Sequence, residues 1–216
     1  PAAKLLLSDA YASGYATSKW AAEILLRNAH EACSIPVNIL RGNMMLAHRD
    51  LPGAINPSDM FTRLLFSVIT TGLAPRSFYG SSPINYDGLP VDLIASCVVN
   101  MREATDENIC VVNACNYASG SGFSLDAIVN GIRNSGYEID EIEAYADWFD
   151  RFSKKLHTLP EIDKQKSSID LLPAFEHPHT SRLQPSFRNF ETLVSKLEGS
   201  LPEMGDAYYA KLLADM

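Results

Sequence analysis

The sequence predicts a layered α/β fold, because segments with helical and with strand-like patterns alternate along its first half. Residues 16–32 carry apolar side chains at three- and four-residue spacing, as an amphipathic helix does. After Pro36, the segment V-N-I-L-R-G at 37–42 is typical of a short β-strand. Further on, N-I-C-V-V-N-A-C at 108–115 has the continuous apolar character of a buried strand. This order indicates strands that are covered by helices.

The remaining elements are predicted to be mainly helical. The predicted helices cover 59–71, 93–103, 125–135, 139–157 and, in two pieces, 187–215. We expect Ser58, Asp92 and Ser124 to be N-caps, because their side chains can accept hydrogen bonds from the first free amides of a helix. Gly72 is expected to end the first of these helices. Prolines favour loops in the stretches 47–57, 73–85 and 160–185.

Composition and charge argue against some broad classes of function. The net charge of -8 does not suit a general nucleic-acid binder, which needs a basic surface. No apolar run approaches the roughly 18 residues of a membrane span, and the N-terminus has no signal-peptide pattern. The four cysteines show no C-x-x-C pair and no zinc-site spacing, so we expect reduced, mostly buried thiols in a cytoplasmic protein. The abrupt start without Met suggests a segment of a longer protein.

Residues 14–20, G-Y-A-T-S-K-W, place a tyrosine four residues before a lysine at the start of the first predicted helix. Four residues make about one helical turn, so Tyr15 and Lys19 are expected on one face. An ammonium so close stabilises a phenolate, and the phenol can then protonate an oxygen while hydride reaches the attached carbon. The same lysine can bind a ribose hydroxyl of a cofactor. The spacing alone also fits a half-buried helix-start tyrosine beside a solvated lysine, because short motifs occur by chance.

The sequence contains no G-x-x-G-x-x-G turn. A dinucleotide-binding fold opens with a strand, a glycine-rich turn and a helix whose N-terminus receives the pyrophosphate. We therefore expect the nucleotide-binding βαβ portion to lie upstream of Pro1.

Several long strings, in one order over nearly the whole chain, are more specific than the tyrosine–lysine spacing. They are G-Y-A-T-S-K-W-A-A-E, L-R-G-N-M-M-L-A-H, P-S-D-M-F-T-R-L-L, T-G-L-A-P-R-S-F-Y, Y-D-G-L-P-V-D, Y-A-D-W-F-D-R-F and S-S-I-D-L-L-P. In these strings the chain resembles the C-terminal thioester reductase domain of carboxylic acid reductases and related nonribosomal-peptide-synthetase-like enzymes. That branch belongs to the extended short-chain dehydrogenase/reductase family.

The resemblance implies a Rossmann-like extended short-chain dehydrogenase/reductase fold that lacks its N-terminal nucleotide-binding βαβ portion. Residues 1–116 would form the C-terminal part of the NADPH-binding core, with an excursion at 44–86 toward the substrate lobe. Residues 117–216 would form a mainly helical lobe that faces the substrate and its carrier.

The resemblance also implies an activity and its residues. Family members transfer hydride from NADPH to an acyl thioester on the phosphopantetheine arm of a carrier, and they release an aldehyde. Tyr15 matches the catalytic tyrosine and Lys19 its partner, and both would also contact the cofactor. Asn43 and Met44 would border the nicotinamide. The family's third member, a Ser or Thr that holds the carbonyl oxygen, would lie upstream.

Asn43 departs from the family pattern. Carboxylic acid reductases commonly have R-C-D-M where this chain has R-G-N-M at 41–44. The missing charge leaves open whether reduction stops at the aldehyde or continues to the alcohol. The implied partners are an acyl or peptidyl carrier domain in the same polypeptide and an adenylation domain upstream. No metal, membrane or nucleic acid is implied, and we expect this segment alone to be inactive.

Two other functions stay open. The chain could belong to another extended short-chain oxidoreductase or epimerase, since these share the tyrosine and lysine. It could also be a non-catalytic fragment that only docks a carrier domain. For that role, Arg151, Lys154 and Lys155 offer a basic helical face, although such a face is more often simply solvated.

Other side chains also have two interpretations. The aromatic residues Phe61, Phe78, Tyr79 and Tyr86 line an acyl pocket or pack a core. His48 faces the active-site cleft or simply lies in a loop. The histidines of H-P-H at 177–179 are too few, without clustered acids, for a metal site.

Overall fold

The computed structural model describes residues 13–42, 44–79, 88–116, 124–178 and 186–216. In these ranges the strands form three parallel pairs. The pairs are β1 (Val37–Gly42) with β5 (Ile109–Ala114), β2 (Met44–Leu46) with β4 (Gly88–Pro90), and β3 (Leu73–Pro75) with β6 (Asp140–Ile142). Parallel strands covered by helices confirm the predicted α/β class.

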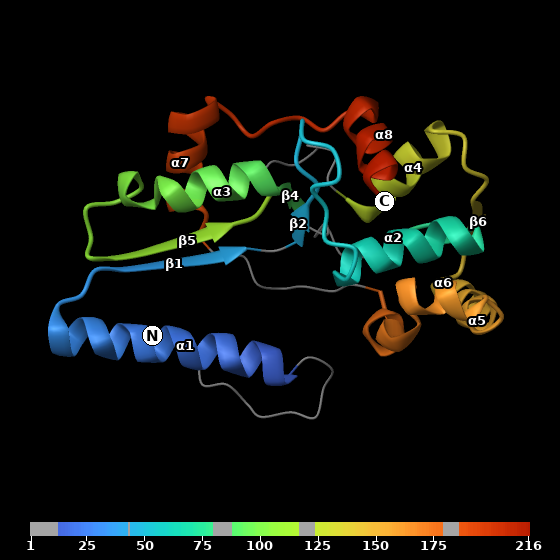
Figure 1. The fold of residues 1–216 in the computed structure, drawn as a ribbon, viewed down its shortest axis with the longest axis horizontal. Helices are drawn as coiled ribbons and strands as arrows, with labels where there is room; N and C mark the ends of the chain where they lie inside the picture. The colour runs from blue at the N-terminus through green and yellow to red at the C-terminus, as the bar shows by residue number, and fades with distance from the viewer. Residues whose placement is uncertain (1–12, 43, 80–87, 117–123, 179–185) are drawn as a thin grey trace.

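The longest pair, β1 with β5, lies between helices. Figure 1 shows α1 (Ser13–Cys33) on one side of it, and α3 (Val91–Val99) with α7 (Arg188–Glu198) on the other. On the α3 and α7 side, a buried cluster includes Cys110, Val112 and Phe190. We call this the strand cluster. Helix α7 therefore packs on the strands, although it lies far along the chain from them.

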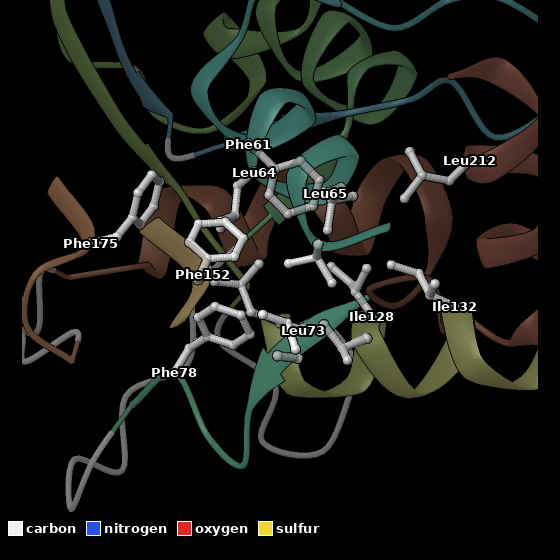
Figure 2. Close-up of a cluster of buried hydrophobic side chains, with 14 of the residues drawn as sticks. Phe61, Leu64, Leu65, Leu73, Phe78, Ile128, Ile132, Phe152, Phe175 and Leu212 are labelled. Atoms are coloured by element: carbon white, nitrogen blue, oxygen red, sulfur yellow. The ribbon is translucent and has the colours of Figure 1, made fainter. Parts of the chain in front are cut away.

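The remaining helices surround a second buried cluster, which we call the helical cluster (Figure 2). These elements are α2 (Met60–Thr71), α4 (Leu125–Asn134), α5 (Tyr145–His157), α6 (Glu161–Lys166) and α8 (Asp206–Asp215), with a 3₁₀ segment at Ile169–Phe175. Trp148 lies fully buried within the cluster and packs against Phe152, with 4.9 Å between the ring centroids. The helical elements thus have a core of their own.

The predicted helix ends have mixed outcomes. Gly72 ends α2 in the left-handed conformation, with φ at 63°, and Ser124 caps α4 by accepting a hydrogen bond from Ala127 N, as expected. The expected Ser58 cap is wrong, because the Asp59 carboxylate accepts from Phe61 N instead.

The expected Asp92 cap is also wrong. Helix α3 begins at Val91, directly after Pro90, and its N-cap makes no side-chain hydrogen bond. The Asp92 carboxylate instead accepts hydrogen bonds from the backbone N and the Nε of Arg49. The helix also ends earlier than expected, and a 3₁₀ turn at Met101–Glu103 follows it.

The surroundings of the thiols agree with the expectation of mostly buried cysteines. Cys97, Cys110 and Cys115 are buried, and Cys33 at the end of α1 is exposed. Within the described ranges, none of the helices combines the length and apolar character needed to cross a bilayer.

Candidate active site

The first turns of α1 lie at the carboxyl edge of the β1–β5 pair. Helix α1 runs antiparallel to β1, so its N-terminal turns lie beside the C-terminal end of that strand (Figure 1). Gly42 of β1 aligns with Ala114 of β5, so both strands end at this edge. In open α/β sheets, ligands bind outside the carboxyl ends of the strands. Tyr15 and Lys19 are therefore at the edge where such folds place a cofactor.

The tyrosine and the lysine share one face of α1, as their spacing predicts. The Lys19 Nζ lies over the Tyr15 ring, 5.3 Å from its centroid. The Tyr15 side chain is 69% exposed, so its hydroxyl is open to a ligand. Below it, the Ser18 hydroxyl donates to Tyr15 O at 2.7 Å and reinforces the first turn. The pair thus presents one phenol and one ammonium side by side to solvent.

An ion pair fixes the orientation of α1 against β1. Arg41, near the end of β1, donates from Nε and Nη2 to the two carboxylate oxygens of Glu23, at 2.8 and 2.5 Å. The Arg41 hydrogen bond holds the pKa of Glu23 below its usual value. Glu23 lies one helical turn beyond Lys19, so this two-point contact ties the Tyr15–Lys19 face of α1 to the end of β1. The sequence analysis missed this pair, although Arg41 interrupts an apolar strand and signals a side-chain partner.

The segment expected to border the nicotinamide is partly described. Asn43 lies outside the described residues. Met44 begins β2, is half-buried, and packs against the helical cluster. It therefore lies between the end of β1 and the helical elements.

Comparisons with known proteins show which proteins this chain is similar to. Residues 3–98 match the family model described as "Male sterility protein", whose label marks it as an NAD-binding family. Carboxylic acid reductase of Segniliparus rugosus is 35% identical over 97% of this chain and 19% of its own length. The carboxylic acid reductase of Mycobacterium tuberculosis is 38% identical over 80% of this chain and 16% of its own length. The chain therefore spans less than a fifth of either relative.

Among solved structures, the reductase domain of a nonribosomal peptide synthetase from Mycobacterium tuberculosis superposes with a TM-score of 0.84. It is 29% identical, and the match covers 97% of this chain and 52% of that domain. Over nearly its whole length this chain is thus similar to the reductase domains of these enzymes. Its parallel pairs and helical cluster are a partial Rossmann-like fold of the extended short-chain dehydrogenase/reductase type.

The basic face weighed for carrier docking lies on α5, which Figure 1 shows apart from α1. Lys154 pairs with Asp150 at 2.8 Å, and the Lys155 ammonium donates to Thr71 O at the end of α2. With Arg151, these lysines line a shallow hollow of about 430 Å³. Two of the three cations are thus already engaged within the chain.

The aromatic residues weighed for an acyl pocket pack a core. Phe61, Phe78 and Tyr79 are buried in the helical cluster, and Figure 2 shows the two phenylalanines among its leucines. The Tyr79 hydroxyl accepts from Leu125 N at 2.7 Å, which ties it to the start of α4. Tyr86 lies outside the described residues. The core interpretation is correct for the three that are described.

Of the histidines weighed above, His48 takes a structural position. His48 Nδ1 accepts from the amides of Asp50 and Leu51, both at 3.0 Å, so it shapes its own loop. His177 is described and His179 is not. In the described part of the chain, no group of three or more His, Cys, Asp or Glu side chains converges as a metal site does.

Proposed function

We propose that this chain is part of a domain that reduces a carrier-bound acyl thioester with NADPH and releases an aldehyde. The observation that carries the proposal is the exposed Tyr15–Lys19 pair at the carboxyl edge of a parallel sheet. The similarity to carboxylic acid reductases supports the substrate class, because those relatives match 80–97% of this chain.

The chemistry needs one proton donor and one stabilising charge. Bound NADPH would supply the hydride to the thioester carbonyl carbon. The Tyr15 hydroxyl would protonate the oxygen that becomes negative, which gives a thiohemiacetal. Breaking its C–S bond, with loss of the hydroxyl proton, would release the carrier thiol and the aldehyde. Tyr15 would regain its proton from solvent, to which it is exposed.

Lys19 suits two tasks in this scheme. Its ammonium over the Tyr15 ring would stabilise developing negative charge on the phenol oxygen. It also has donors free to bind a ribose hydroxyl of the cofactor, since in the described part of the chain its ammonium forms no ion pair. Asn43 and Met44 would border the nicotinamide at the end of β1. These residues fit a nicotinamide cofactor, while a choice of NADPH over NADH would depend on residues upstream.

We assign the two parts of the chain different tasks. Residues 1–116 would hold the cofactor, and residues 117–216 would face the substrate and a carrier domain of the same cytoplasmic polypeptide. An adenylation domain would precede that carrier. The upstream nucleotide-binding portion would pair with the second edge of β1, beside which the described ranges place no strand, and would cover the exposed Leu25 and Leu26 of α1. We therefore expect activity only when that portion is present.

The test uses the complete reductase domain with an acyl-phosphopantetheine thioester. Oxidation of NADPH is followed together with the product, trapped as a hydrazone. The proposal predicts aldehyde formed in step with NADPH consumed, and no turnover of a sugar nucleotide. Consumption of two NADPH per thioester would show that reduction continues to the alcohol. Turnover of the sugar nucleotide, or carrier binding without any NADPH oxidation, would refute the proposal.

A further inference from the structure

The loop at 47–54, directly after β2, is held from three different helices. The Tyr208 hydroxyl of α8 donates to Ala47 O at 2.8 Å, and Gly53 N donates to the Asp215 carboxylate of α8, also at 2.8 Å. Asp215 is almost fully buried and also binds Lys211 at 2.5 Å. The C-terminal helix α8 therefore forms hydrogen bonds with both ends of this loop.

Arg49, in the middle of the loop, binds two carboxylates from other elements. Its backbone N and its Nε donate to Asp92 of α3, at 3.1 and 2.5 Å. Its Nη1 and Nη2 donate to Glu198 at the end of α7, at 3.0 and 2.7 Å. The guanidinium is 26% exposed and the Asp92 side chain 14%, so water competes only partly for these bonds.

These contacts come from both clusters. Helices α3 and α7 belong to the strand cluster, while Tyr208 of α8 belongs to the helical cluster. The loop is thus a joint between the part that carries Tyr15 and Lys19 and the helical part. It is also the direct continuation of β2, whose first residue is Met44.

Resting on the proposed function, we propose that Arg49 is a positioning residue of the reductase site. By binding Asp92 and Glu198 it fixes the loop, and with it Met44 at the start of β2, which would border the nicotinamide. A small displacement of this segment would misplace the cofactor ring relative to Tyr15, and displacements of about 1 Å can cost up to about a hundredfold in rate. Arg49 itself need touch neither cofactor nor substrate.

The experiment compares Arg49→Met with Arg76→Met in the complete domain. Arg76 is a matched control, because it pairs with Glu143 on the open surface of the helical part. Amide exchange over residues 47–54, the dissociation constant for NADPH, and kcat are measured well below the unfolding temperature. Arg49→Met should raise exchange of the loop and lower kcat about tenfold or more, with NADPH binding changed less than about threefold. Arg76→Met should alter none of the three.

A conservative variant separates positioning from mere stability. Arg49→Lys should recover part of kcat only, because an ammonium lacks the planar set of donors with which the guanidinium binds Glu198 at two points and Asp92 at a third. Should Arg49→Met fail to fold, Glu198→Gln carries the same readouts with a milder change. An unchanged kcat in a folded variant, or unchanged exchange of the loop, would overturn the inference. An inactive wild-type domain would instead overturn the proposed function, while the exchange data still report whether Arg49 holds the loop.

Discussion

Replacing Trp148 with alanine is expected to destabilise the helical part of the chain by about 3–5 kcal/mol. Trp148 is fully buried on α5, and its ring meets those of Phe78, Tyr145 and Phe152 at centroid distances of 5.4, 4.9 and 4.9 Å. Removing the indole leaves a cavity that three aromatic rings cannot close without leaving their own packing. The cost therefore falls at the upper end of large-to-small core substitutions.

A second variant isolates the hydrogen bond of the indole. Trp148 Nε1 donates to Leu73 O at 3.3 Å, and Leu73 is buried in β3. Strand β3 pairs with β6 through its other edge, since Asp140 N donates to Gly72 O and Arg76 N to Ile142 O. Trp148→Phe keeps most of the ring and leaves the Leu73 carbonyl without its donor, which costs about 1–3 kcal/mol.

The measurement is urea unfolding of the complete domain, followed by far-ultraviolet circular dichroism. Val99→Ala is the control, because Val99 is 82% exposed on α3 and its loss should stay within about 0.5 kcal/mol. The urea concentration at the unfolding midpoint should be highest for the control, lower for Trp148→Phe and lowest for Trp148→Ala. A Trp148→Ala variant with the same unfolding midpoint as the control would show that the helical cluster does not stabilise the helical part of the chain.

Three further predictions follow from packing, charge and burial. Gly131→Ala should cost about 1–3 kcal/mol, because an added Cβ would lie 2.6–2.9 Å from Tyr209, whereas Gly205→Ala meets nothing within 4 Å and should be nearly neutral; thermal unfolding separates them. The Arg49 hydrogen bond lowers the pKa of Glu198, and Lys211 and Gly53 outweigh burial and lower that of Asp215. The stabilisation that these two carboxylates contribute is therefore complete above their unfolded-state pKa values, near 4, and is lost as pH falls through their folded-state pKa values. Asp215→Asn should therefore make the free energy of unfolding depend less on pH in the acid range. Burial raises the pKa of Cys97 to about 11, so among this chain's thiols only exposed Cys33 should react fast with a disulfide reagent, and Cys33→Ser should remove that phase.

Long periodic segments were predictable from the sequence because their patterns depend on local burial. The helix at 16–32 and the strands at 37–42 and 108–115 agree with α1, β1 and β5 to within a few residues. The three-residue strands β2, β3, β4 and β6 are too short to show a period of two, so no pattern could reveal them. The prediction was wrong for β3, which lies in a stretch expected to be a loop, and for β6, which lies at the start of the segment expected to be a helix over 139–157.

The candidate site was predictable only where one element holds it. Tyr15 and Lys19 lie on a single helix, so their shared face follows from a spacing of four. Arg49 binds the carboxylates of Asp92 and Glu198, which lie 43 and 149 residues away in the sequence, and no local sequence pattern predicts contacts over such distances. The Arg49–Asp92 contact also explains why Asp92 was wrongly predicted to be an N-cap. The sequence shows that an aspartate can accept hydrogen bonds, but it does not show which donor supplies them.

The most direct test of the account is single-turnover aldehyde formation by Tyr15→Phe in the complete domain, with NADPH binding measured in parallel. Tyr137→Phe, an exposed tyrosine after α4, serves as the control. If Tyr15 donates the proton, the rate should fall by about a hundredfold or more, with NADPH binding and folding unchanged. Aldehyde formation at the wild-type rate in Tyr15→Phe would contradict the central claim, and the tyrosine would then be only the start of a helix.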